Sequence, residues 1–433
     1  MTWWRWGRCS MDADNAGIEA QVGGGRRASG LYLAHLVDCA LHGAAPEVLP
    51  EGASWEEVHA LAARNGMEGA SWRAAALAGD VPSELRRRWA AEADMTLLRL
   101  LRFDAEREQV LSAMAARGLS YLPLKGVLIA GYYPAPEMRS MADNDILYGF
   151  VEPDEGGGFR ISGADEAERG RATALAVREA AALMAERGYE AVSLGKGNHE
   201  SFHKKPSFNF ELHRRLVASS SPHAAYYANP WKRALRDGAD SHLLRFPDED
   251  EYLYFLVHAH KHFDSAGCGI RFVADLRVLL DAKGARMDWG YVRSELKALG
   301  LADFEACSRS LADAAFGGAC SMAGPDGGPL LNGVQESLLM HLLGCGTYGT
   351  MEGRIRRQLG KIVAENEGDL ARAKRRYLLE RTFIPEDAIK DAFPAFHRHK
   401  ALRPLLPAYR ACRGLARHPK RIWRELKMLF EAR

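Results

Sequence analysis

Residues 122–148 read LPLKGVLIAGYYPAPEMRSMADNDILY, and this stretch decides the fold of the chain. A short apolar run ends at a Lys-Gly pair, and a second apolar segment follows until two prolines interrupt it. An arginine comes next, then two acids one residue apart, Asp143 and Asp145, and then a last apolar run. The pattern predicts a strand, a short helix that the prolines end, and a second strand.

The flanking sequence continues this alternation of helices and strands. A helical pattern begins after Pro82, where Ser83 is the expected N-cap, and Gly118 is a natural end for it. The segment 151–163 is acidic and rich in glycine, which predicts a surface loop inserted in the core. Around it we predict strands at 120–124, 144–150, 189–194, 200–204 and 207–213, and helices at 126–133 and 164–187.

The last of these strands has an informative alternation. Its apolar side chains fall on one face, and Asn209, Glu211 and His213 fall on the other. A strand with a wholly polar second face lies at the surface or faces a site.

Acidic side chains on two of the predicted strands suggest a metal site. Asp143 and Asp145 at positions i and i+2 project to the same face, where they can share one or two hard cations. Glu211 is the best candidate for a third carboxylate. An Asp-x-Asp pair alone is also compatible with a turn in which Asp143 caps and Asp145 is solvated. The order of elements around the pair favours the metal site.

Basic residues in the same stretch suggest contact with phosphate. Lys125 and Gly126 lie at a strand-to-helix junction, where a glycine lets phosphate approach the backbone. The guanidinium of Arg139 can form paired hydrogen bonds with phosphate oxygens.

These residues resemble a known family, the uncharacterised nucleotidyltransferases of the polymerase-β-like superfamily. The resemblance rests on Leu124-Lys125-Gly126, Tyr133-Pro134, Arg139 with Asp143-x-Asp145-Ile146-Leu147, Phe210-Glu211-Leu212-His213, His258 to His262, and Arg271-Phe272-Val273-Ala274-Asp275-Leu276. It covers residues 100–281 well and the C-terminal helices loosely.

The resemblance implies a nucleotidyltransferase core, a nucleoside triphosphate (NTP) as donor, and Mg²⁺ or Mn²⁺ held by Asp143, Asp145 and Glu211. Two positions depart from the family pattern. Asn144 stands where an apolar residue is usual, so its amide is expected on the packed face at a desolvation cost unless it is hydrogen-bonded. Val127 replaces a serine that could contact phosphate.

The length of 433 residues predicts two or three domains. We expect an α+β fold, with a small mixed β-sheet core, a helical N-terminal region and a helical C-terminal domain. The predicted boundaries are a disordered or linker-like tail at 1–30, the N-terminal helical region at 31–117, the nucleotidyltransferase core at 118–215 and the C-terminal helical domain at 216–433.

Cysteine usage and hydropathy bear on the compartment. Seven scattered cysteines without a CxxC pair favour a reducing, cytoplasmic environment. The Trp-rich N-terminus has no apolar run typical of a signal peptide, and no window is long enough for a membrane span. We therefore expect no integral membrane association. The Trp-rich start is compatible with contact to a membrane surface, but a frayed or locally packed tail is favoured.

The predicted C-terminal helices carry further candidates. In HAHKH, His258 and His262 share a helix face, and Lys261 and His262 are weaker candidates for contact with nucleotide or acceptor, as is His213 on its strand. The alternative is a hydrogen-bonded helix surface, and for Asp275 an intrahelical ion pair with Arg271. Basic runs at 354–376 and 410–427 are compatible with RNA binding, although a solvated helix face is favoured.

The sequence thus predicts a metal-dependent enzyme that moves a nucleoside monophosphate (NMP) from an NTP to an unknown acceptor and releases pyrophosphate. The alternative is a catalytically weak nucleotide-binding or interaction module with the same fold, for which Asn144 is the main support. The sequence names neither the base of the NTP, nor the acceptor, nor the oligomeric state.

Overall fold

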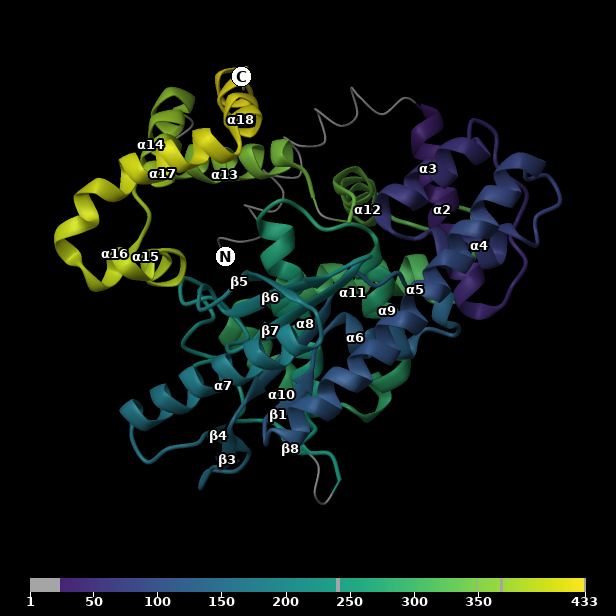
Figure 1. The fold of residues 1–433 in the computed structure, drawn as a ribbon. Helices are drawn as coiled ribbons and strands as arrows, with labels where there is room; N and C mark the ends of the chain where they lie inside the picture. The colour runs from purple at the N-terminus through teal and green to yellow at the C-terminus, as the bar shows by residue number, and fades with distance from the viewer. Residues whose placement is uncertain (1–23, 239–241, 348, 367–368, 432–433) are drawn as a thin grey trace.

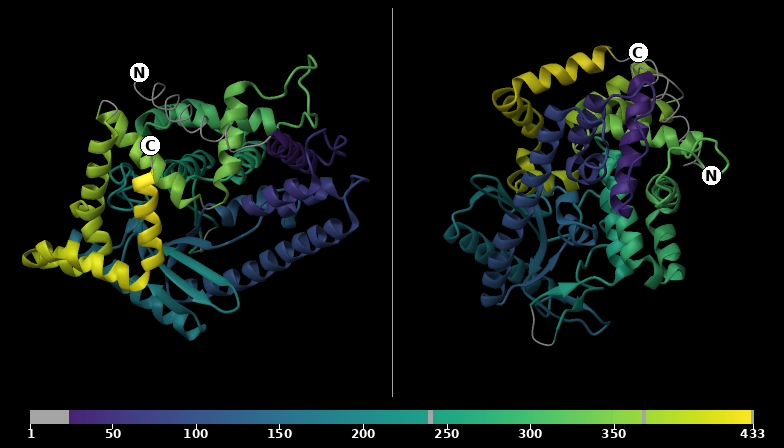
Figure 2. Two further views of the ribbon diagram at one scale, coloured as in Figure 1. Left: turned by 90° about the horizontal axis from the view of Figure 1, so that it is seen from above. Right: turned by 90° about the vertical axis from the view of Figure 1, so that its right-hand side faces the viewer.

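The computed structural model describes residues 24–238, 242–347, 349–366 and 369–431 (Figures 1 and 2). At its centre is a five-stranded mixed sheet in the order β1-β2-β7-β6-β5. Its strands are β1 (Ser120–Pro123), β2 (Asn144–Gly149), β5 (Glu190–Ser193), β6 (His199–Lys204) and β7 (Phe208–His213). The strands β2 and β7 run parallel, and the other neighbours are antiparallel. This mixed sheet among helices confirms the predicted α+β fold.

Two long helices cover one face of the sheet. These are α5 (Ser83–Ala116) and α7 (Glu166–Glu186), and a cluster of buried apolar residues joins them to β2, β6 and β7. The cluster includes Met114 and Leu183 from the helices and Ile146 and Leu212 from the strands, all at most 1% exposed. The alternation in β7 explains the packing, because Phe210 and Leu212 point to the helices and leave the polar residues on the opposite face.

The opposite face of the sheet turns toward a different helix. A second apolar cluster joins Leu122 of β1 and Leu147 of β2 to Tyr254 of α8 (Asp248–Asp264). The short helix α6 (Gly126–Ile129) follows β1, and the 3-10 turns η1 (Ala130–Tyr132) and η2 (Pro136–Met138) lead on to β2. The polar face of β7 therefore lies on the α8 side of the sheet.

The largest apolar core lies among the N-terminal helices and the helices that directly follow the sheet. It draws on α2 (Gly24–His42), α3 (Trp55–Asn65) and α4 (Glu68–Ala75), and on α8, α9 (Arg271–Lys283), α10 (Trp289–Leu299), α11 (Ala302–Phe316) and α12 (Gly333–Cys345), with the turn η3 (Gly284–Arg286) between α9 and α10. The N-terminal helices thus share a core with the first helices that follow the sheet.

The remaining helices extend as an arm, drawn in yellow-green and yellow, on the side away from the purple N-terminal helices (Figure 1 and the left view of Figure 2). They are α13 (Met351–Glu365), α14 (Leu370–Thr382), α15 (Glu386–Ala392), α16 (Pro394–Arg398), η4 (Lys400–Leu405), α17 (Leu406–Arg417) and α18 (Pro419–Glu431). A small cluster around Ile355, Tyr377 and Leu429 holds α13, α14 and α18 together.

The structure corrects three local expectations. The segment 151–163 forms the hairpin β3 (Val151–Pro153) and β4 (Phe159–Ile161) rather than a loop, and Phe159 donates its backbone N–H to the carbonyl of Trp231. Pro82, not Ser83, is the residue that precedes α5. The predicted tail at 1–30 is helical from residue 24, where α2 begins, and its residues 1–23 lie outside the described part.

None of the helices in the described ranges combines the length and the apolar character that crossing a bilayer requires. Two very short strands, β8 (Leu235–Arg236) and β9 (Leu244–Arg245), complete the description, and β9 lies beside β1.

Candidate active site

The parallel pairing of β2 and β7 places two acidic residues next to each other. Asp145 is the register partner of Glu211, and Leu147 is the partner of His213. Since partners on adjacent strands share a face, Asp145, Glu211 and His213 all lie on the α8 side of the sheet. Asp143 directly precedes β2, and the side chain of Asn209 donates a hydrogen bond to its carboxylate.

Asp145 is the most tightly held of the acids. Lys125 Nζ lies 2.8 Å and His213 Nε2 lies 2.9 Å from the same oxygen, Oδ1. Burial would raise the pKa of Asp145, but the charge of Lys125 and the bond from His213 hold it well below its ordinary value. Burial alone would lower the pKa of Lys125, and the Asp145 carboxylate raises it instead. The lysine is therefore charged and paired with Asp145.

The backbone explains how Lys125 reaches this position. The N–H of Leu124 donates to the carbonyl of Asp145 at 2.9 Å, which ties the end of β1 to the start of β2. Lys125 then adopts a left-handed φ of 52° at the sharp change of direction before α6. Such a conformation is uncommon for a residue other than glycine and is found at functional sites.

Burial and neighbouring negative charge also act on the two other acids, Glu211 and Asp143. Burial and the charge of Asp145 raise the pKa of Glu211 to about 7, and the same two causes raise the pKa of Asp143. Three carboxylates thus concentrate negative charge on one patch of the sheet. A bound cation would relieve their mutual repulsion.

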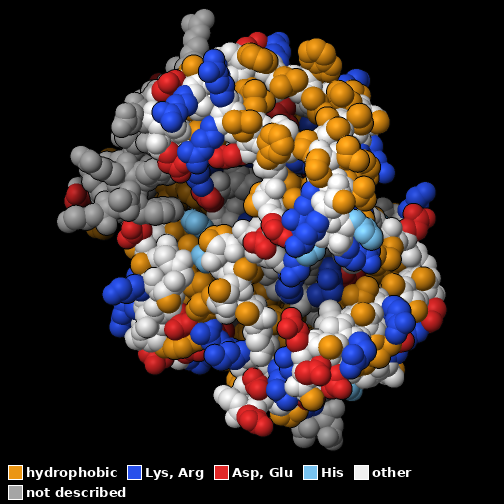
Figure 3. All heavy atoms as spheres, turned by 90° about the vertical axis from the view of Figure 1, so that its left-hand side faces the viewer, with side chains coloured by type: hydrophobic (Ala, Val, Ile, Leu, Met, Phe, Trp, Pro, Cys, Tyr) orange, Lys and Arg blue, Asp and Glu red, His pale blue; other side chains and the backbone are white. Residues whose placement is uncertain are grey.

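Helix α8 faces these acids with basic and imidazole groups. The side chain of Lys261 is exposed to solvent. Surrounding protein atoms and the charge of Lys125 nevertheless lower its pKa, whereas the charges of Glu211 and Asp145 act in the opposite direction. His262 Nε2 lies 3.1 Å from His258 Nε2. Burial lowers the pKa of His258, and crowding by protein atoms and the charge of Lys261 lower the pKa of the solvent-exposed His262. On the face drawn in Figure 3, lysine, arginine and histidine side chains gather around a hollow near the middle.

His199 is a further residue of the candidate site, and the sequence did not predict it. On β6 it is the register partner of His213, and its Nε2 lies 3.6 Å from Glu211 Oε2. Burial and the neighbouring His213 lower the pKa of His199 to about 4. The alternation in HESFHK puts His199 on the same face as Ser201 and His203, so the polar face of β6 was a signal that could have found it.

Within the described residues, two groups of three side chains bring their ligand atoms within 4.8 Å of one another. One is His199, Glu211 and His213 at this site. The other, Asp38 with His42 and Cys320, lies away from the sheet in the helical core. Asp143 and Asp145 belong to neither group. A metal-ligand role for these two residues stays a prediction.

A comparison of the sequence with protein families covers the residues of the candidate site. Residues 51–150 and 173–317, together more than half of the chain, match the family described as uncharacterised nucleotidyltransferases. The chain belongs to this nucleotidyltransferase family. The match confirms the family inferred from the sequence and includes the predicted site residues Lys125, Asp143, Asp145 and Glu211. Searches among curated proteins and among solved structures gave no match.

In this member of the family, Arg139 has a different environment from the one expected of a phosphate ligand. Its side chain is 8% exposed, and its Nε and Nη2 lie 2.8 and 2.9 Å from the two oxygens of Asp275 on α9. Tyr133 also donates to Asp275, at 2.9 Å, and Arg271 donates to Ser140. Arg139 and Tyr133, which precede β2 in the chain, are thus partners of Asp275.

Gly126 is adapted to the same arginine. A Cβ atom at this position would lie 2.8 Å from Arg139 Nη1, which is closer than real Cβ contacts. Arg139 Nη1 also donates to the carbonyl of Gly126 at 3.3 Å. The need for glycine here is therefore explained by the buried arginine, and a role of either residue in nucleotide binding stays a prediction.

Asn144 behaves as its position between the acids suggested. The side chain is fully buried on the α5 side of the sheet, where its Oδ1 accepts a hydrogen bond of 3.0 Å from Arg107. Its Nδ2 has no hydrogen-bond partner among the described residues. The desolvation cost of the amide is thus offset for the oxygen and not for the nitrogen.

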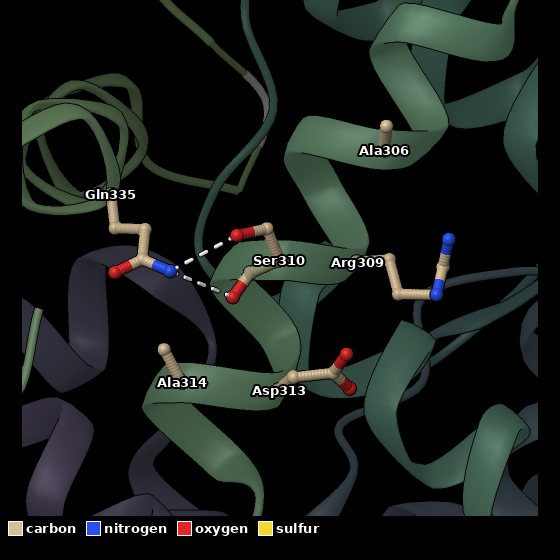
Figure 4. Close-up of a pocket in the computed structure, with 6 residues that line it drawn as sticks. All are labelled: Ala306, Arg309, Ser310, Asp313, Ala314 and Gln335. Carbon is tan, nitrogen blue, oxygen red and sulfur yellow. Dashed lines mark hydrogen bonds between the residues drawn. The ribbon is translucent and has the colours of Figure 1, made fainter. Parts of the chain in front are cut away.

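A second hollow of about 510 Å³ lies far from this chemistry, on α11 and α12, and opens broadly to solvent. Figure 4 shows Gln335 and Ser310, two of its polar residues, joined by hydrogen bonds. Gln335 Nε2 donates to Ser310, Asp313 pairs with Arg277, and Arg309 pairs with Glu305. These contacts explain the hollow as a packing feature, and we assign it no function.

Proposed function

We propose that this chain is a metal-dependent nucleotidyltransferase that moves an NMP from an NTP to an acceptor and releases pyrophosphate. One observation carries the proposal: Asp145 and Glu211 are neighbours on parallel strands, and Asp143 directly precedes one of them. Oxygen ligands of this kind suit Mg²⁺ and Mn²⁺. Residues 118–215 would form the catalytic core.

Asp143, Asp145 and Glu211 are the residues that would hold Mg²⁺ or Mn²⁺. Burial and repulsion between the acids raise the pKa of Asp143 and Glu211. A bound cation would offset both effects, which supports these residues as ligands. When bound, the ion would supply charge that polarises the α-phosphate and stabilises the leaving pyrophosphate.

Two lysines would act on the triphosphate. Lys125 neutralises Asp145 at 2.8 Å, and an anionic phosphate beside this pair would share its ammonium group. Lys261 is exposed on the α8 side of the sheet, and the charges of Glu211 and Asp145 act on its ammonium group. The ammonium group would therefore be close enough to these acids to contact a bound nucleotide. His262 would border the same space. His213 would orient Asp145 through its Nε2, 2.9 Å away.

The direct test is transfer of label from an α-labelled NTP. The protein is incubated with the labelled NTP, Mg²⁺ or Mn²⁺, and cell extract, next to the double variant Asp143→Ala/Asp145→Ala. A matched control is Glu155→Ala, which removes an exposed acid from the turn between β3 and β4. We expect label on an acceptor with the wild type and the control. Equal labelling by the double variant would contradict the proposal.

A second candidate function is a nucleotide-binding module that turns over weakly. Two observations favour it: the unpaired amide nitrogen of Asn144 beside the acids, and the occupation of Asp145 Oδ1 by Lys125 and His213. Such a module would bind NTP in equilibrium dialysis and give no labelled product.

The acceptor could be RNA, through the basic helices α13, α14, α17 and α18. Several of their arginines are engaged within the protein, for example Arg376 with Glu365 and Arg381 with Glu425. RNA binding would weaken steeply as salt rises, and a flat salt dependence would contradict it. We propose a cytoplasmic location, in line with the six scattered cysteines of the described residues, all of which are free thiols.

A further inference from the structure

We propose that His199, Glu211 and His213 form a binding site for a divalent transition-metal ion that accepts nitrogen ligands, such as Zn²⁺, in preference to Mg²⁺. The proposal deepens the proposed function, on which it rests for its biological role, because it names the kind of ion that this face of the sheet selects. The metal binding itself can be measured without any transfer reaction.

The spacing of the three side chains matches such an ion. His199 Nε2 and His213 Nε2 lie 3.6 and 3.7 Å from Glu211 Oε2, and the three ligand atoms all lie within 4.8 Å of one another. An ion with bonds of about 2.1 Å in tetrahedral geometry holds its ligands about 3.4 Å apart. The observed separations are therefore close to what a bound ion would impose, and only small side-chain movements are needed.

The scaffold that holds these ligands is rigid. His199 and His213 are register partners on the antiparallel strands β6 and β7, and their rings lie 4.9 Å apart. Glu211 projects from the same face as His213, two residues earlier on one strand. Ligands on neighbouring strands of a sheet keep their geometry without an ordering cost, which favours binding.

The ligand set also discriminates between ions. Mg²⁺ requires near-octahedral oxygen coordination and is bound poorly by imidazole, whereas Zn²⁺ and other first-row ions accept histidine nitrogen readily. Two imidazoles and one carboxylate resemble the ligand sets of zinc sites that keep a further position open. Asp143 and Asp145 are not members of this three-residue group, and the nitrogen nearest to Asp145 Oδ1 besides that of Lys125 is His213 Nε2, at 2.9 Å.

Binding requires a proton to move on His213. Its Nε2 now faces Asp145 Oδ1 at 2.9 Å, and its Nδ1 faces the side-chain amide of Asn198 at 3.3 Å. An ion at Nε2 places the imidazole proton on Nδ1, where the amide oxygen of Asn198 can accept it after the amide turns. Asp145 then keeps its bond from Lys125 at 2.8 Å and stays neutralised.

The other three-residue group does not share these properties. Both oxygens of Asp38 accept backbone N–H groups, from Gly318 at 2.9 Å and from Cys320 at 2.7 Å. These bonds hold the loop after α11 against α2, so that carboxylate already has a structural role.

The test is metal binding by the full chain in the absence of nucleotide. Isothermal titration with Zn²⁺, Mn²⁺ and Mg²⁺ is combined with the visible absorption spectrum of bound Co²⁺, which reports nitrogen ligation. The variants are His199→Ala and Asp143→Ala. The matched control is His203→Ala, an exposed histidine on the same strand and face.

We expect one equivalent of Zn²⁺ to bind more tightly than Mg²⁺, and His199→Ala to lose at least about tenfold in affinity. His203→Ala and Asp143→Ala should bind Zn²⁺ as the wild type does, and unchanged circular dichroism would show that the variants fold. Wild-type affinity in His199→Ala, or loss of the equivalent only in Asp143→Ala, would overturn the inference. Zn²⁺ binding without label transfer would refute the proposed function alone, and transfer without Zn²⁺ preference would refute this inference alone.

Discussion

Replacing Asp275 by asparagine should destabilise the protein strongly, because it leaves the guanidinium of Arg139 buried without a counter-charge. The two side chains are 7% and 8% exposed and are joined by two hydrogen bonds of 2.8 and 2.9 Å. Removing one partner of a buried ion pair typically costs about 3–5 kcal/mol, since the other charge stays desolvated. We expect a loss of about that size in the free energy of unfolding for Asp275→Asn.

The assay is urea unfolding followed by tryptophan fluorescence, with the slope of the transition checked against the wild type. Asp281→Asn is the matched control, since it removes an acid from the same helix whose side chain is 51% exposed and pairs with Arg277. This control should cost less than about 1 kcal/mol. The double variant Arg139→Met/Asp275→Leu should recover most of the lost stability, because it removes both charges.

Either of two results would refute this reasoning. One is a loss under about 1 kcal/mol for Asp275→Asn, which would mean that the Arg139 charge is not desolvated. The other is a loss for Arg139→Met/Asp275→Leu equal to the sum of the losses for Arg139→Met and Asp275→Leu measured alone, which would mean that the side chains are not coupled. A role of Arg139 on phosphate would then regain support.

The remaining predictions concern residues in or beside the candidate site. Gly126→Ala should cost about 1–3 kcal/mol in unfolding free energy, because the added Cβ meets Arg139 Nη1 at 2.8 Å; wild-type stability would contradict this. Asn144→Val should change stability by less than about 1 kcal/mol, since it loses the bond from Arg107 and also removes an unpaired amide; a loss above about 2 kcal/mol would contradict it. Burial and Asp145 raise the pKa of Glu211 from 4.5 to about 7, so the folded state binds this proton more strongly than the unfolded state. The metal-free protein should therefore lose stability relative to Glu211→Gln as the pH rises from about 4.5 to about 7, and melting temperatures that stay parallel across this range would contradict it.

Much of the fold follows from local patterns in the sequence. The helix expected at 164–187 is α7, Glu166–Glu186, and the strand expected at 144–150 is β2, Asn144–Gly149. In both cases the period of apolar residues fixes the element without help from distant parts of the chain. The polar alternation in β7 likewise indicated that Glu211 and His213 share a face, which the structure confirms.

The features that escaped prediction depend on contacts between distant residues. The hairpin β3–β4 forms in a glycine-rich segment because Trp231 accepts its backbone N–H, more than 70 residues away. The partner of Arg139 lies 136 residues later, so the sequence could not distinguish a buried ion pair from a phosphate ligand.

In the candidate site, too, some features follow from the local sequence and others depend on contacts between distant residues. Side-chain alternation could place Asp145 and Glu211 on the sheet, and the family resemblance supplied their expected role. Neither could show that Lys125 and His213 occupy one oxygen of Asp145, or that His199 lies opposite His213. Those facts depend on strand order and register, which the sequence leaves open.

The central claim is that the protein transfers a nucleoside monophosphate and not another part of the NTP. The most direct measurement compares α-labelled and γ-labelled NTP in parallel reactions with Mg²⁺ or Mn²⁺ and cell extract. The account predicts that, in excess of the reaction with Asp143→Ala/Asp145→Ala in the same extract, α-label appears on an acceptor and γ-label appears as pyrophosphate or the phosphate formed from it. Transfer of γ-label to an acceptor above the level of the double variant, or no transfer of α-label above that level, would contradict it.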